Sequence, residues 1–176
     1  MLVLEELEHA RRRGAPIYAE VKAYRTCNSA YHLLYPEPNG LGLIRTTREA
    51  LREAEMTPAD VDLVAAQGCS LLDYDRMESR CIQESFGEHR PRVSAITSFI
   101  GNPLGGLGAF QGAVSALALK HQTYPPHANA DSPDTVYPIR LAARQAEPGP
   151  LRAVVQNSYC FMAKHSTLVY SRWEEN

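Results

Sequence analysis

The chain has 176 residues, of which 44% are hydrophobic and 22% are charged, which fits one globular domain and excludes a disordered chain. Its formal net charge is -2, from 18 Lys and Arg against 20 Asp and Glu, which argues against binding to nucleic acid or to an anionic membrane surface. No apolar stretch approaches the ~20 residues that span a bilayer, and the N-terminus lacks a signal pattern, so we expect a cytoplasmic protein.

The first third of the chain predicts two strands and two helices in alternation. Apolar residues 2–4 are typical of a strand stub, and the charged residues 5–13 predict a helix. Residues 17–24 are rich in β-branched and aromatic side chains and predict a strand. Residues 46–55 predict a helix that opens with a capping box, because Thr46 is followed by Glu three positions later.

The middle of the chain continues this alternation. Residues 61–66 predict a strand, residues 73–85 a helix, and residues 93–97 a short strand. A glycine-rich start at 104–108 leads into the apolar run 113–119. This run is too apolar to face water, so it predicts a buried helix whose small residues let another backbone approach closely.

The C-terminal part predicts a loop and two final strands. Pro125 and Pro126 end the preceding element, and a loop rich in Pro, Asp and Asn continues to about Pro138. Residues 151–158 and 167–173 predict strands. The whole order predicts an α/β fold, a layered sheet with covering helices, in a single domain over residues 1–176.

No motif in the chain predicts a cofactor or a metal site. The four cysteines lack C-x-x-C spacing and are best interpreted as reduced thiols. They are Cys27, Cys69, Cys81 and Cys160. The glycines near residue 106 do not complete a phosphate-binding loop, because Gln111 stands where Gly or Ala is needed.

Two cysteines and two carboxylates are weak candidates for chemistry. Cys69 and Cys160 each follow a predicted strand, where nucleophiles occur in α/β enzymes, but neither has a histidine beside it in the sequence. Asp75 and Glu78 share one face of a predicted helix. This spacing could hold a metal ion or a salt bridge, but solvated carboxylates are the simpler interpretation.

Short motifs occur in a fixed order along nearly the whole chain. They are the segment 2–10, Ala-Tyr-His at 30–32 with Pro-Glu-Pro at 36–38, Phe-Gly-Glu-His at 86–89, Pro-Pro at 125–126, Asn-Ser at 157–158 and Leu-Val-Tyr at 168–170. This set resembles the C-terminal half of a β-ketoacyl-ACP synthase, a type II condensing enzyme. The resemblance implies one half of a thiolase-like fold, with residues 1–45 as the tail of the N-terminal half and residues 46–176 as the C-terminal half.

The resemblance also locates the family's catalytic positions. The family condenses an acyl thioester with malonyl-ACP, and two histidines of the C-terminal half donate hydrogen bonds to the malonyl thioester oxygen. The first lies in Asn-Ala-His-Gly-Thr-Ser-Thr, where residues 65–71 read Ala-Ala-Gln-Gly-Cys-Ser-Leu, so Gln67 replaces it. The second lies in Lys-Ser-Met-Thr-Gly-His, where residues 97–102 read Thr-Ser-Phe-Ile-Gly-Asn, so Thr97 replaces the lysine and Asn102 the histidine.

Two further departures from the family accompany these. The glutamate that the family places near the lysine is Gln111 here, so both charges are missing together. The glycine-rich gating loop Phe-Gly-Phe-Gly-Gly-Thr-Asn reads Tyr-Cys-Phe-Met-Ala-Lys-His at 159–165. We therefore expect acyl gating at Phe161 to be altered or lost, and Gln67, Asn102 and Phe161 to contact substrate without catalysing its reaction.

The resemblance implies a function without catalysis by this chain. We expect a ketosynthase-like subunit that completes a hetero-oligomeric condensing enzyme in polyketide or fatty-acid biosynthesis, as a chain-length factor does. Its expected partners are a ketosynthase or a separately encoded N-terminal half, and acyl carrier protein. Two alternatives stay open: a composite acyl-transfer site that uses Gln67, Cys69 or Cys160, and a free-standing module that binds acyl carrier protein or an acyl group.

Overall fold

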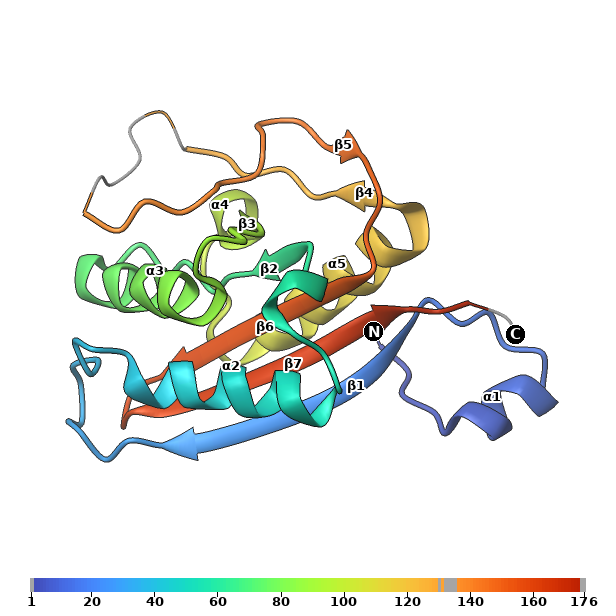
Figure 1. Ribbon diagram of the computed structural model, residues 1–176, viewed down its shortest axis with the longest axis horizontal. Helices are drawn as coiled ribbons and strands as arrows, with labels where there is room; N and C mark the ends of the chain where they lie inside the picture. Colours follow the sequence, from blue (N-terminus) through green and yellow to red (C-terminus); the bar gives the residue numbers. More distant parts are fainter. Residues whose placement is uncertain (1, 130, 132–135, 175–176) are drawn as a thin grey trace.

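The computed structural model describes residues 2–129, 131 and 136–174, which form a five-stranded sheet between two layers of helix (Figure 1). The sheet strands are β1 (Ala19–Asn28), β2 (Leu63–Ala65), β3 (Arg92–Ser94), β6 (Ala153–Cys160) and β7 (Lys164–Arg172). The helices are α1 (Leu7–Arg12), α2 (Leu41–Glu53), α3 (Leu72–Phe86), α4 (Thr97–Ile100) and α5 (Leu107–His121), with 3₁₀ turns η1 (Pro58–Asp60) and η2 (Leu104–Gly106). A separate two-stranded sheet joins β4 (Thr123–Tyr124) to β5 (Glu147–Pro148).

The main sheet has the strand order β1-β7-β6-β2-β3. β1, β7 and β6 pair antiparallel, whereas β2 is parallel to both β6 and β3. β2 and β3 are parallel, and α3 is the crossover that returns the chain to the same end of the sheet between them. The predicted α/β fold with a layered sheet is therefore confirmed.

The two faces of the sheet are covered by different helices (Figure 1). Val169 packs with residues of α2 and α3, and the next residue, Tyr170, packs with Ala118 and Leu119 of α5. Because successive side chains of a strand point to opposite faces, α2 and α3 lie on one side and α5 lies on the other. The core is thus divided into two layers by β6 and β7.

The capping box expected at Thr46 is wrong. α2 begins five residues earlier, after Gly40, whose φ of 62° lies in the left-handed region that glycine tolerates. Thr46 is fully buried inside the helix, and its hydroxyl donates to the carbonyl oxygen of Leu43 at 3.0 Å. It also accepts a hydrogen bond from the Thr167 hydroxyl of β7 at 3.0 Å, so this residue joins helix to sheet.

Other boundaries differ from the sequence expectation. Residues 2–4 are exposed and pair with none of the described strands, so the expected strand stub is absent. The strand expected over 93–97 ends at Ser94, and Thr97 starts the short α4. The two-residue strands β4 and β5 were not expected, and residues 130 and 132–135 of the predicted loop lie outside the described residues.

The buried helix expected over 113–119 is confirmed as part of α5, but only one of its faces is covered. Ser115 and Leu119 are fully buried against the sheet, whereas Phe110 is 50% and Leu117 is 45% exposed. Within the described parts of the chain, no helix is long and apolar enough to cross a membrane. The open side of α5 borders the site described below.

Candidate functional site

Two carboxylates of α3 hold the loop that follows β2. Glu78 is 3% exposed and accepts backbone hydrogen bonds from Gln67 and Gly68, each at 2.9 Å. Asp75 accepts a further one from the backbone N–H of Cys69 at 2.9 Å. These contacts fix the loop at the carboxyl end of β2, so both carboxylates have a structural role, and the buried Glu78 is not the solvated side chain that the sequence pattern favoured.

The charge state of this anchor is set by its burial. Desolvation raises the pKa of Glu78 to about 7, with the nearby Asp75 carboxylate contributing in the same direction. Burial also raises the pKa of Asp75 above its ordinary value. Two neighbouring carboxyl groups therefore share a poorly solvated site, where ionisation of one disfavours ionisation of the other.

Gln67 continues the sheet beyond the end of β2. Ala65 is the last residue of β2 and lies opposite Gln156 of β6. Three residues further along β6, the backbone N–H of Tyr159 donates to Oε1 of Gln67 at 2.7 Å. Among the described residues, Nε2 of Gln67 donates to no side chain or carbonyl, so both N–H groups of this amide are free to donate.

Thr97 lies on the same loop. Its hydroxyl is 2.6 Å from the carbonyl oxygen of Gly68 and 3.0 Å from that of Gln67, so it donates into the loop backbone. A neutral hydroxyl thus occupies the position that the resemblance assigns to a lysine. The structure brings Gln67 and Thr97 together, as the sequence comparison with the family implied.

Asn102 and Phe161 lie at the edge of this region and are exposed. Oδ1 of Asn102 accepts a hydrogen bond from the backbone N–H of Leu104 at 2.9 Å, which forms a local turn. Phe161 is 52% exposed and packs edge-on against Tyr74 with ring centres 6.2 Å apart. Met162 and Ala163 have φ values of 64° and 53°, so this hairpin keeps a left-handed turn without glycine.

Gln111 is a buried connection between α5 and the sheet. It is 1% exposed, and its Nε2 donates to the carbonyl oxygens of Ala65 at 3.0 Å and Asn157 at 3.1 Å. Its Oε1 accepts from the Ser158 hydroxyl at 3.2 Å. The Gln111 amide is therefore satisfied entirely by neutral groups.

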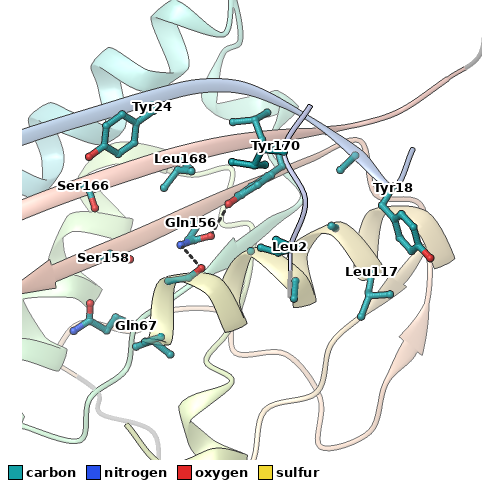
Figure 2. A pocket seen from close by; sticks show the side chains of 18 of the residues that line it. Leu2, Tyr18, Tyr24, Gln67, Leu117, Gln156, Ser158, Ser166, Leu168 and Tyr170 are labelled. Atoms are coloured by element: carbon teal, nitrogen blue, oxygen red, sulfur yellow. Dashed lines mark hydrogen bonds between the residues drawn. The ribbon is translucent and has the colours of Figure 1, made fainter. Parts of the chain in front are cut away.

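A broad groove of about 1550 Å³ borders this region, although Thr97 and Gln111 do not line it. Figure 2 shows Leu168 and Tyr170 of β7 across the groove from α5, which carries Leu117 on its open side, and Tyr24 of β1 further along the sheet. Tyr170 donates to Oε1 of Gln156 at 2.9 Å on the sheet side of the groove. Gln67, Asn102 and Phe161 also line it, so the three expected substrate-contacting residues share one cavity.

Tyr159 is a site residue that the sequence did not reveal. Its hydroxyl donates to Glu78 at 3.1 Å, its ring stacks on Tyr74 at 5.5 Å, and burial raises its pKa well above the ordinary value. The pairing of Tyr159 with Gln67 spans 92 residues, so no local pattern could indicate it. The available signals were the place of Tyr159 directly after the predicted strand 151–158 and its alignment with the first residue of the family's gating loop.

Neither candidate cysteine is activated by a histidine. The Cys69 thiol lies 3.7 Å from Asp75 and 3.9 Å from the Tyr159 hydroxyl, and burial raises its pKa. Cys160 is exposed at the end of β6. Across the described part of the chain, neither thiol is hydrogen-bonded to a histidine, and no group of His, Cys, Asp and Glu is arranged to hold a metal ion.

Comparison with known proteins matches this geometry to one family. The family model described as "Beta-ketoacyl synthase, C-terminal domain" matches residues 18–131. The chain belongs to the beta-ketoacyl synthase family. The sequence resemblance to the C-terminal half of a ketosynthase is thereby confirmed, together with its thiolase-like fold.

Individual relatives align with almost the whole chain. It is 36% identical over 173 residues to the 3-oxoacyl-[acyl-carrier-protein] synthase 2 of Coxiella burnetii, which covers 97% of this chain and 42% of that protein. One chain of a solved structure described as "The ishigamide ketosynthase/chain length factor" matches with a TM-score of 0.92 and 30% identity, over 97% of this chain and 42% of the other.

A second solved structure has the same degree of fit. It is a type II polyketide acyl-carrier protein in complex with its ketosynthase bound to the hexaketide, with a TM-score of 0.92 and 28% identity over 97% of this chain and 42% of the other. The chain therefore spans about two fifths of the length of the relatives it matches. How it divides between the two ketosynthase halves, expected near residue 45, stays a prediction.

Proposed function

We propose that this chain is a non-catalytic, ketosynthase-like subunit of a cytoplasmic, heteromeric condensing enzyme in polyketide or fatty-acid biosynthesis. Structures of a ketosynthase with a chain length factor and with an acyl-carrier protein, both similar to this chain, favour the polyketide branch. The proposal rests mainly on the hydrogen bond that the Gln67 side chain makes within the chain itself. The Gln67 amide binds the backbone of Tyr159 at the position where the family resemblance places a proton-handling histidine.

The chemistry of the three replaced positions supports the absence of catalysis. The side chains of Gln67, Thr97 and Asn102 are two amides and a hydroxyl, none of which exchanges a proton near neutral pH. Each also makes a hydrogen bond to the backbone. Gln67 keeps free N–H donors for a thioester oxygen, but loss of such donors from a catalytic set costs roughly 10²- to 10³-fold in rate.

The groove supports a role in assembly. Its walls carry the open face of α5 and the exposed segment 2–4, where Leu4 is 80% and Val3 is 66% exposed. Contiguous apolar surface of this kind marks an interface. We propose that a ketosynthase or an N-terminal half covers it in a stable complex of on the order of 2,000 Å², and that the chain thereby shapes the acyl tunnel or the docking of acyl carrier protein.

The test compares a ketosynthase purified with and without this chain. We expect the pair to copurify, and product formation or product length to change when the chain is omitted. Intact-mass measurement of the isolated chain after incubation with acyl and malonyl carrier protein should detect neither acylation nor decarboxylation. A partner that is equally stable and active alone, or acyl-enzyme formation by this chain, contradicts the proposal.

A further inference from the structure

A second cavity lies at the opposite end of β2 from the groove. It has a volume of about 280 Å³ and shares no lining residue with the groove. It lies at the amino ends of β2 and β3, where β4 and β5 also meet. Its walls include four basic residues, one carboxylate and the ring of Tyr124; the charged or basic residues are His89, Arg90, Arg92, Arg140 and Asp62.

One wall of this cavity is held in place by stacking. The guanidinium of Arg92 lies 4.1 Å from the centre of the Tyr124 ring, and it also pairs with Glu147. The Tyr124 hydroxyl donates to the carbonyl oxygen of Pro150 at 2.9 Å. A Cβ atom on Gly149 would lie 2.8 Å from the same ring, so only glycine permits this packing between the two prolines.

The charges around the cavity do not balance. Arg92 is paired with Glu147, and Asp62 is 3.6 Å from Arg152 and accepts the backbone N–H of Arg152 at 2.6 Å. Arg90 and Arg140 make no ion pair with any carboxylate of the described residues. Two guanidinium groups with unused donors therefore line one small cavity.

Several of these charged side chains lie close enough to Tyr124 to influence the pKa of its hydroxyl. Burial raises the pKa of its hydroxyl, and Asp62 contributes in the same direction. Arg92, Arg140 and Arg152 each act to lower it, so all three cations lie within electrostatic reach of one ring. The cavity is thus a concentration of positive charge on a chain whose net charge is -2.

We propose that this cavity binds a phosphate dianion, as inorganic phosphate or as the phosphate group of a small monoester. Two unpaired guanidinium groups match a double negative charge, and their planar donor sets suit phosphate oxygens. A volume of about 280 Å³ is large enough to hold a phosphate group. The site is independent of the proposed subunit function, because it uses none of the residues of the groove.

The test is calorimetric titration of the purified protein with inorganic phosphate and with phenyl phosphate, each against chloride at equal ionic strength. We expect saturable binding that weakens about tenfold in Arg140→Gln and in Arg90→Gln, since each change removes a charged hydrogen-bond donor. Arg12→Gln, an exposed arginine of α1 outside the cavity, is the matched control and should bind as the unchanged protein does.

A variant with the opposite sign separates binding from stability. Glu147→Gln removes the carboxylate that competes for Arg92, so it should bind phosphate more tightly, which a merely destabilised protein would not do. Tighter binding of phenyl phosphate identifies a monoester site, and binding of inorganic phosphate alone identifies a free-phosphate site. No saturable binding of either anion, or equal weakening by Arg12→Gln, overturns the proposal.

Discussion

The side-chain oxygen of Gln67 lies 2.7 Å from the backbone nitrogen of Tyr159 and accepts its hydrogen bond. β2 ends two residues before Gln67, so this amide takes the place of the next backbone carbonyl in the ladder with β6. The position that the family resemblance assigns to a catalytic histidine thus has a structural function in this chain. That function can be measured without any substrate.

Gln67→Met should destabilise the protein by about 1–3 kcal/mol, because it leaves the backbone N–H of the buried Tyr159 without an acceptor. Methionine has nearly the same length as glutamine, so packing changes little. Gln145→Met is the control, since Gln145 is exposed. Urea unfolding of both variants measures the effect, and an equal loss in the two would argue against a structural amide at Gln67.

The sequence predicted the α/β order of elements and the family positions, but not how these positions are used. Residue type at Gln67, Thr97 and Asn102 was enough to predict that these side chains do not transfer protons, which stays a prediction. The partners of these residues depend on contacts such as Gln67 with Tyr159, which are 92 positions apart. The capping-box prediction at Thr46 failed for a related reason. The helix begins before Thr46, and the Thr46 hydroxyl accepts a hydrogen bond from the distant Thr167, which no local pattern could indicate.

Glu78 should make stability depend on pH in an unusual direction. Its pKa is raised from 4.5 to about 7 in the folded protein, so between these values the folded state keeps a proton that the unfolded state releases. The free energy of unfolding therefore falls as pH rises through this window, by up to about 3 kcal/mol for this group, and levels off above it.

Glu78→Gln should remove this component of the pH dependence. The variant should also be less stable overall, because Gln67 and Gly68 each donate to a different oxygen of Glu78, and glutamine replaces one of these oxygens with an NH2 group that cannot accept a hydrogen bond. The diagnostic quantity is the slope of unfolding free energy against pH between about 4.5 and 7. Glu88→Gln, in an exposed position, should retain the original slope, and an unchanged slope in Glu78→Gln would refute the assignment.

Gly42 is a position where a single methyl group should be costly. A Cβ atom there would lie 2.5 Å from Cδ2 of the buried His165, so Gly42→Ala should lose about 1–3 kcal/mol through overpacking. Gly105→Ala has nothing within 4 Å and should be nearly neutral. Thermal unfolding should also show that Gly42→Ala costs less in a His165→Ala background, and additive effects would exclude this contact as the cause.

The open face of α5 should be necessary for assembly and dispensable for folding of the chain. Leu117→Asp places a charge on a side chain that is 45% exposed in the groove, so it should abolish copurification with a ketosynthase partner while changing the stability of the isolated chain by less than about 1 kcal/mol. Leu41→Asp, 58% exposed at the start of α2, is the control. Retained assembly of Leu117→Asp would show that the partner binds elsewhere.

Substitution of the two candidate cysteines decides between a structural subunit and a composite acyl-transfer site. Burial raises the pKa of Cys69, so little nucleophilic thiolate forms there near neutral pH, and Cys160 has no hydrogen-bonded histidine among the described residues to serve as its base. Cys69→Ser and Cys160→Ser should therefore leave the turnover of the reconstituted complex within about twofold, since serine keeps the size and the hydrogen bonding of the thiol. A nucleophile would instead lose several orders of magnitude on this change, because its covalent intermediate could no longer form. Assay of the two variants with the same partner therefore distinguishes the two functions by how much turnover is lost: at most about twofold for a structural subunit, and several orders of magnitude for a composite acyl-transfer site.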